Sequence, residues 1–246
     1  MFVHLNIHST YDLLYSSLKI NDVVSKAKEN RYQALAITDT NVLYGFPKFY
    51  DACVKEGIKP IFGMTVMVSD EISTIETVLF AKNNEGLHAL YQLSSAINMK
   101  QKTTIPLKWL QKYSYHLAIV FKDAHASHQS LIQTLKNNES VFINHTSQLD
   151  FSDDKIVFLN NARYLNPEDA DTIPALKAIK NNTKLDLVND IKDAHEYFPT
   201  SENIKAFQLS EKIIAKEGAD GVSVISVITH SQNIDKTVNK LKHYFK

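Results

Sequence analysis

The sequence predicts an α/β protein assembled from alternating strands and helices. Through about the first 180 residues, short β-branched and apolar runs alternate with segments whose apolar residues recur at helical spacing. Six or seven of these runs are expected to be strands, and 44% hydrophobic with 22% charged residues is an ordinary globular composition. This pattern is typical of a largely parallel barrel or of a doubly wound sheet, and it does not choose between them.

The first third of the chain is expected to hold three strands and two helices. In order, these are a strand at 2–7, a helix capped by Asn21, a strand at 34–39, a helix starting near Gly45 and Pro47, and a strand at 59–68. Asparagine is a favoured cap because its side chain accepts a hydrogen bond from a free backbone amide, and proline suits the first helical turn. If the first strand is regular, His4, Asn6 and His8 share one face of it.

The pattern continues to about residue 180. The expected elements are a strand at 75–81, a helix at 84–98, a polar joint at 100–106, a strand at 116–121, a helix at 125–137, strands at 140–144 and 155–160, and a helix at 167–180. Asn166 and Pro167 open the last helix.

Charge and cysteine content exclude several classes of function. Lys plus Arg equals Asp plus Glu, 27 each, so no global field attracts this chain to nucleic acid, and any contact with DNA must be local, weak or indirect. The single cysteine, Cys53, closes no internal disulfide and builds no usual zinc site. No apolar run approaches the roughly 20 residues that span a bilayer. We therefore expect a cytoplasmic, unprocessed protein with no membrane partner.

Four motifs carry a family resemblance. They are "FVHLNIHSTYDLL", "ALAITDTNVLYGFPKFYDACVKEGIKPIFGMTVMV", "VLFAKNNEGLHALYQLSS" and "YFPTSENIKAF". Together they resemble the N-terminal PHP (polymerase and histidinol phosphatase) domain of bacterial DNA polymerase III alpha subunits of the Gram-positive type, over residues 1–210. The resemblance implies a distorted (β/α)7 TIM-like barrel. It also implies a mouth at which active members hold two or three metal ions and hydrolyse phosphoesters, whereas in other members this site has decayed.

The family's ligand positions can be placed on this sequence. His8 and Asp39 retain residues that can bind a metal, whereas the other matching positions are occupied by Asn6, Thr40, Thr65, Asn161 and Arg163. A two-metal hydrolase needs several anionic or imidazole ligands around each cation. Threonine is a poor substitute for them, and a guanidinium has no lone pair to offer. We therefore expect no catalytic residue and no bound metal, and we considered a salt bridge between Arg163 and Asp39 in its place.

The last part of the chain, residues 211–246, does not continue this resemblance. Its segment "GADGVSV" and the following turn resemble the final βα unit of thiamine-phosphate synthase, a TIM-barrel enzyme. Within it, a strand at 222–228 and a helix capped by Ser231 are expected, and together they would form a βα appendage of uncertain packing.

Three functions follow from these expectations. The first is a PHP-domain fragment of a replicative polymerase alpha subunit, without the polymerase palm, which supports the rest of the polymerase and binds replication proteins. The second is an active PHP phosphoesterase or 3′-5′ exonuclease, which would need zinc, manganese or magnesium. The third, and weakest, is a phosphate-binding TIM-barrel protein. Residues 11–20 are equally suited to a partner surface and to internal packing.

Overall fold

The computed structural model describes residues 3–135, 138–144, 146–149, 151–152, 155–185 and 196–199. Its α-helices are α1 (Ile20–Glu29), α2 (Phe46–Glu56), α3 (Asn84–Met99), α4 (Leu107–Tyr113), α5 (Gln129–Gln133) and α6 (Thr172–Asn181). Its strands are β1 (Ala34–Ile37), β2 (Lys59–Ser69), β3 (Thr74–Ala81), β4 (Ile105–Pro106), β5 (Leu117–Phe121), β6 (Val141–Asn144) and β7 (Ile156–Val157). The strand predicted at 222–228 and the helix predicted to be capped by Ser231, both in residues 211–246, lie outside these ranges.

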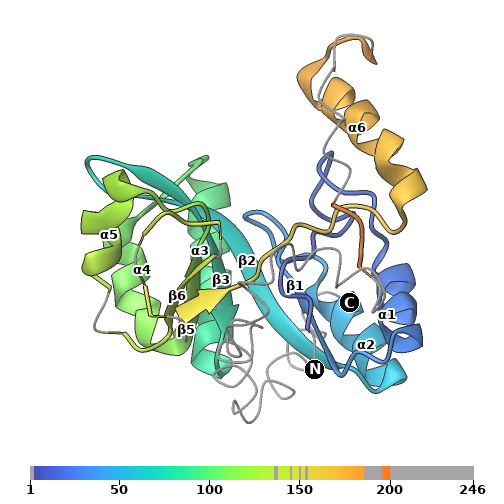
Figure 1. Cartoon of the computed structure of the whole chain (residues 1–246), viewed down its shortest axis with the longest axis horizontal. Helices are drawn as coiled ribbons and strands as arrows, with labels where there is room; N and C mark the ends of the chain where they lie inside the picture. Colours follow the sequence, from blue (N-terminus) through green and yellow to red (C-terminus); the bar gives the residue numbers. More distant parts are fainter. Residues whose placement is uncertain are drawn as a thin grey trace.

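The strands form one mixed sheet in the order β1-β2-β3-β5-β6-β7, with the short β4 paired to the end of β2. Figure 1 labels β1, β2, β3, β5 and β6 of this sheet. β1 with β2, β5 with β6, and β6 with β7 are parallel, but β3 is antiparallel to both of its neighbours. The expectation of a largely parallel sheet was therefore wrong at β3. Only the short turn after Ser69 joins β2 to β3, and a turn of this length permits an antiparallel hairpin but not a crossover.

Two extended segments close the sheet into a distorted barrel. The segment from Val3 to His8 lies between β1 and the chain that follows β7, through single parallel bridges from His4 to Leu35 and from Ile7 to Ala162. The amide of His8 donates to the carbonyl of Ala162 over 3.0 Å. The segments expected as strands at 2–7 and 155–160 are thus part of the barrel wall, but regular ladder pairing is confined to β7. We call each strand or extended segment of this wall a stave.

The inside of the barrel is filled by alternate residues of its staves. This inner cluster comprises Val3, Leu5, Ala34, Ala36, Ile61, Val78, Phe80, Ala118, Val120, Phe142, Val157 and Leu159, all of them buried. Side chains two apart on a strand share a face, so one face of every stave points inward. Small residues on β1 leave room for Phe80 and Phe142, as close packing of the interior requires.

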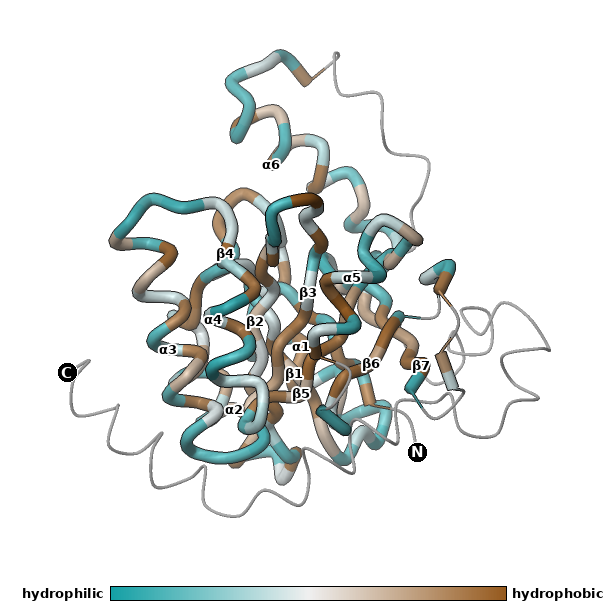
Figure 2. The backbone as a smooth tube through the Cα atoms, turned by 90° about the vertical axis from the view of Figure 1, so that its left-hand side faces the viewer, coloured by the Kyte–Doolittle hydropathy of each residue, from teal (hydrophilic) through white to brown (hydrophobic). Residues whose placement is uncertain are grey.

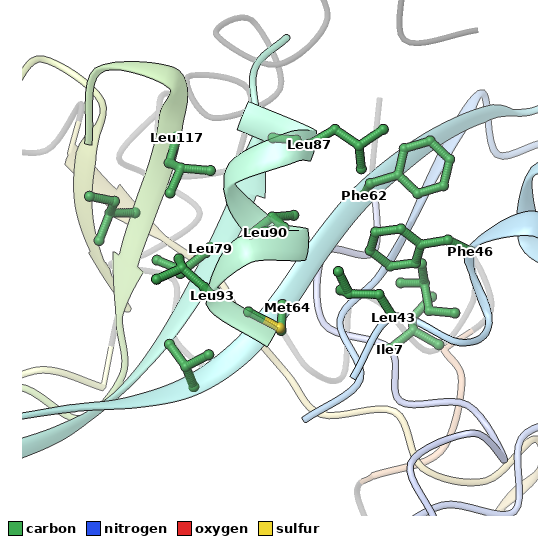
Figure 3. Packing of buried hydrophobic residues seen from close by; sticks show 14 of the residues in the cluster. Ile7, Leu43, Phe46, Phe62, Met64, Leu79, Leu87, Leu90, Leu93 and Leu117 are labelled. Atoms are coloured by element: carbon green, nitrogen blue, oxygen red, sulfur yellow. The ribbon is translucent and has the colours of Figure 1, made fainter. Parts of the chain in front are cut away.

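The outer faces of the strands pack against the helices. Leu87, Leu90 and Leu93 on one side of α3 lie against β2 and β3, where Met64 and Leu79 are buried (Figure 3). At the start of α2, the ring centroids of Phe46 and Phe62 are 4.8 Å apart. The tube in Figure 2 has its apolar strands enclosed by helices with hydrophilic outer faces. Burial of this apolar face, rather than intrinsic propensity, is what stabilises such helices.

Several predicted boundaries differ from those observed. Asn21 does not cap α1: the cap position is Lys19, whose side chain makes no capping hydrogen bond, and Asn21 lies in the first turn. The helix expected at 125–137 is reduced to a 3₁₀ turn at Ala126–His128 and the short α5. The last predicted helix opens as a 3₁₀ turn, Pro167–Asp171, before α6. Among the described residues, no helix has the length and apolar character required to cross a bilayer.

Candidate functional site at the barrel mouth

A layer of polar side chains lies directly above the inner core, at one end of the barrel. Counting two residues along five strands or extended segments from the last apolar member of the inner cluster reaches Thr38, Glu76, Lys122, Asn144 and Asn161, and on β2 the count passes Gly63 to reach Thr65. β3 runs in the opposite direction, so on that strand the count goes backwards from Val78 to Glu76. The two-residue period of the strands therefore places these groups together at the mouth.

A chain of hydrogen bonds crosses this mouth. The ammonium of Lys122 lies 2.5 Å from Glu76 Oε1 and donates to Asn161 Oδ1 over 3.1 Å. Asn6 Nδ2 donates to the same Asn161 oxygen over 2.5 Å, and Thr38 Oγ1 donates to Asn6 Oδ1 over 3.0 Å. Lys122 is only 8% exposed, so its charge requires the compensation that Glu76 supplies.

Arg163 occupies the next part of the mouth and is also paired. Its Nη1 lies 2.7 Å from Glu196 Oε2, and its Nε donates to the carbonyl of Tyr15 over 2.9 Å. The proposed salt bridge between Arg163 and Asp39 was wrong. Glu196 reaches the guanidinium instead, because the amide of Arg163 donates to the carbonyl of Glu196 and brings the two segments together.

The side chains able to bind a metal form a second, adjacent cluster. His8, Asp12 and Asp39 are buried and each offers a ligand atom within 4.8 Å of the others. His8 Nδ1 donates to Asp12 Oδ2 over 2.9 Å, and the backbone amide of Thr40 donates to the same carboxylate oxygen over 2.9 Å. Sequence reasoning missed Asp12, although its position four residues after His8 was a usable signal.

The two carboxyl groups of this cluster differ in their pKa. Burial raises the pKa of Asp39 to about 6, although it accepts hydrogen bonds from the amide and hydroxyl of Ser9 over 2.5 and 2.7 Å. Burial also opposes ionisation of Asp12, but its hydrogen bond and charge interaction with His8, together with Thr40, hold the pKa of Asp12 below the ordinary value. Asp12 therefore loses its proton at a lower pH than Asp39 does.

Tyr15 connects the two parts of the mouth. Its ring lies edge-on to His8, with centroids 4.8 Å apart, and under the guanidinium of Arg163, whose central carbon is 4.0 Å from the ring centroid. Burial raises the pKa of the Tyr15 hydroxyl, so this side chain stays neutral. Sequence reasoning did not identify Tyr15 or Glu196, because nothing local marks either as a partner of Arg163.

The expected ligand positions do converge. Asn6 contacts Asn161, Thr40 forms a bridge with Thr65, and the hydroxyl of Thr65 donates to the carbonyl of Thr38 over 2.9 Å. His4 does not share the face of Asn6, since its ring lies against Phe198, 5.7 Å between centroids, in the outer packing layer. Burial, and then the nearby His8, lower the pKa of His4 to about 3.

The residues present fit a polynuclear metal centre poorly. Both oxygens of Asp39 and the Oδ2 of Asp12 already accept hydrogen bonds from protein groups. Two cations, Lys122 and Arg163, lie at the same mouth and would repel a bound metal ion. One feature favours a single ion: Nε2 of His8 is buried and has no hydrogen-bond partner among the described residues. The cluster can therefore offer at most one imidazole and two carboxylates.

Comparison with known proteins identifies the family to which this chain belongs. The model of the PHP domain matches residues 4–155. A DNA polymerase III subunit alpha of Staphylococcus epidermidis (strain ATCC 35984) is 52% identical over 214 residues, which is 87% of this chain and 20% of that protein. The corresponding subunit of Staphylococcus aureus (strain Mu50) is 47% identical over 216 residues, 88% of this chain and 20% of that protein. This chain therefore spans about a fifth of the length of these relatives.

Among solved structures, an amidohydrolase from Chromobacterium violaceum is 13% identical, with a TM-score of 0.42, over 58% of this chain and 76% of that chain.

Proposed function

Because this chain belongs to the PHP domain family, we propose that it is the N-terminal PHP part of a replicative DNA polymerase III alpha subunit, with a barrel mouth that has a structural role and no hydrolytic one. The relatives named above support the parentage, since their identity extends over most of this chain. In this proposal the polymerase reaction belongs to the rest of the subunit. The chain supports that machinery and binds replication proteins.

The observation that carries the structural role is the pairing of Lys122 and Arg163. Each cation lies at the end of a barrel stave, where it is bound to a carboxylate, Glu76 or Glu196. Lys122 also donates to Asn161, and Arg163 binds Glu196, so both cations reach segments of the barrel wall that lie outside the regular strand ladders. In this proposal the network stabilises the mouth without a metal ion.

The chemistry available at the mouth also argues against hydrolysis. A metal-assisted reaction needs a cation that polarises a phosphate oxygen and lowers the pKa of a water molecule. His8, Asp12 and Asp39 are the groups that would hold such an ion, and their hydrogen bonds to one another and to Ser9 and Thr40 restrict them. Side chains that retain these hydrogen bonds stabilise the loops after two staves without any metal.

The experiment is a measurement of metal content combined with unfolding. We expect purified protein to contain less than stoichiometric zinc, manganese, iron or magnesium by inductively coupled plasma analysis, and EDTA to leave its melting temperature unchanged. Single-stranded DNA incubated with the protein and Mn²⁺ should release no nucleotides above the level of a His8→Ala variant. Stoichiometric metal together with a lower melting temperature in EDTA would refute the proposal.

A second candidate, an active phosphoesterase with one metal ion, rests on the free Nε2 of His8 and the two carboxylates beside it. It predicts Mn²⁺-stimulated release of nucleotides that His8→Ala and Asp12→Asn both abolish. Replacing Asn161, which contacts Lys122 rather than this cluster, would leave that activity in place.

A further inference from the structure

One surface outside the barrel mouth combines positive charge that forms no ion pair among the described residues with half-buried aromatic rings. It consists of the C-terminal end of α3, the loop that follows, and α4. Its lysines are Lys100, Lys102, Lys108 and Lys112, all exposed. We refer to it as the α3–α4 surface. The helices α3 and α4 lie side by side in Figure 2. The hydroxyl of Tyr113, on α4, donates to Gln92 Oε1, on α3, over 2.5 Å.

The lysines of this surface outnumber the acidic residues near them. From residue 86 to residue 122 the sequence contains no aspartate or glutamate. Within the part of the chain that the structure describes, none of these four lysines forms an ion pair. The adjacent β2–β3 turn carries two acidic residues, Asp70 and Glu71, and among the described residues neither forms an ion pair with these lysines. A protein with no net charge therefore has a locally basic face, and such a face attracts polyanions.

The aromatic rings of the surface are held next to its ammonium groups. The Nζ atoms of Lys100 and Lys102 lie 5.1 and 5.6 Å from the centroid of the Trp109 ring, and Nζ of Lys112 lies 5.1 Å from that of Tyr113. Trp109 is only partly buried, so part of its ring is accessible to a ligand. The ammonium groups lie over the ring faces, so a base that stacks on Trp109 takes their place and leaves them to contact its phosphates.

A groove continues the surface along α3. It has a volume of about 570 Å³ and is lined by His88, Tyr91, Gln92, Ser95, Met99 and Lys100. Met99 is 85% exposed, so its apolar side chain is available to a ligand in this groove. Basic rims beside a groove with aromatic and apolar walls are the features by which proteins bind single-stranded nucleic acids, where phosphates meet lysines and bases stack.

The α3–α4 surface lies on the same side of the barrel as the mouth. The hydroxyl of Ser94 and the amide of Asn98, both on α3, donate to the carbonyl of Asn41 over 2.7 and 3.0 Å. Asn41 directly follows Thr40, whose amide binds Asp12 in the mouth. A strand bound along α3 would therefore pass beside the barrel mouth without entering it.

We propose that the α3–α4 surface binds single-stranded DNA, with Trp109 stacking on a base and Lys100, Lys102, Lys108 and Lys112 contacting phosphates. The proposal rests on the proposed function only in naming DNA rather than RNA as the strand. It requires no metal ion and no hydrolysis.

The test uses the full 246-residue chain and a fluorescently labelled, unstructured oligothymidylate. Trp109 is the only tryptophan in the sequence, so its emission reports on this surface alone. We expect the oligonucleotide to quench that emission in the presence of EDTA, with an affinity that falls with salt at a logarithmic slope of about −3 for four phosphate contacts. Trp109→Ala should weaken binding by about 5- to 150-fold by fluorescence anisotropy, and Trp109→Phe by less, because stacking on one base has this range.

A charge-matched pair of variants separates this surface from general attraction. Replacing Lys100, Lys102, Lys108 and Lys112 by glutamine should bring the salt slope close to zero. The same replacement of four exposed lysines elsewhere, Lys19, Lys48, Lys55 and Lys180, should leave both the slope and the quenching nearly unchanged.

Three results would overturn the proposal. They are an absence of quenching, an equal loss of binding in the two lysine variants, and stronger quenching and competition by a polyglutamate peptide than by the oligonucleotide. The last result would assign the surface to an acidic protein partner. None of them bears on the proposed function of the mouth, which metal content and nuclease assays test separately.

Discussion

The central carbon of the Arg163 guanidinium lies 4.0 Å from the centroid of the Tyr15 ring. In the sequence, these two residues are separated by almost the whole barrel. The same ring touches His8, so a cation and an imidazole are joined through one aromatic side chain. A cation over an aromatic face is stabilised more strongly when both are shielded from water. Arg163 is therefore held in the mouth by contacts of its own positive charge, which a metal ligand at this position would not make.

Breaking the pair of Arg163 with Glu196 should destabilise the barrel. The two side chains are 15% and 29% exposed, so the charge left behind is partly desolvated. We expect Arg163→Met to lower the free energy of unfolding by about 2–3 kcal/mol, measured by urea denaturation. In a double-mutant cycle with Glu196→Gln, the coupling energy should be about 1–2 kcal/mol. Lys48→Met, at an exposed position, serves as the control and should cost less than about 0.5 kcal/mol.

The raised pKa of Asp39 should make this residue unfavourable to stability at neutral pH. The folded protein keeps the Asp39 proton up to about pH 6, whereas the unfolded chain loses it near the ordinary aspartate pKa of 3.8. Folded molecules therefore bind more protons in this window, and the contribution of Asp39 to the free energy of unfolding falls by about 3 kcal/mol as pH rises through it. Asp39→Asn should gain that amount relative to the parent between pH 4 and pH 7 in urea denaturation.

Asp12→Asn is the matched control for this titration. The pKa of Asp12 is lowered, so its carboxylate contributes stability at neutral pH that is lost as pH falls. Relative to the parent, Asp12→Asn should therefore become less stable as pH rises, the opposite sign to Asp39→Asn. The same sign in both variants would contradict the two assignments.

Buried, neutral His4 should make the protein sensitive to mild acid. Below pH 6.5 the unfolded chain takes up a proton on His4, whereas the folded protein does not until about pH 3. The free energy of unfolding should fall by about 1.4 kcal/mol for each pH unit below 6.5 through this residue alone. His4→Gln should reduce the loss between pH 6.5 and pH 5 by about 2 kcal/mol. If His88→Gln, at an exposed position on α3, reduces it equally, burial of His4 is not the cause.

Gly86, in the first turn of α3, should tolerate no side chain. A Cβ atom there would collide with the backbone carbonyl of His116 and lie 3.2 Å from the Cα of Ala81. Because backbone atoms cannot turn aside, Gly86→Ala should cost about 2 kcal/mol or more in thermal or urea unfolding. Gly57→Ala provides the contrast. Its Cβ would meet little, but φ is +71°, so only conformational strain of about 1 kcal/mol is expected.

Much of the sheet was predictable, because local patterns decide it. β2, β3, β5 and α3 begin and end within about two residues of the prediction, since the two-residue and 3.6-residue periods of apolar side chains are local properties. The direction of β3 was not predictable from alternation, which is the same in parallel and antiparallel strands. The start of α1 was misplaced because Asn21 satisfied the preference for a cap without occupying the cap position.

The candidate site also has a part that was predictable from the sequence and a part that was not. The sequence determined that Asn6, His8, Asp39, Asn161 and Arg163 meet at one mouth, because each follows a stave of the same barrel and family motifs identify the staves. Only the tertiary structure decided which groups pair there. In it, Arg163 pairs with Glu196 and stacks on Tyr15. Lys122 pairs with Glu76, and His8 with Asp12. The reason is physical: strand periodicity is encoded by neighbours in the chain, whereas electrostatic pairing depends on distances between loops that only the closed barrel brings together.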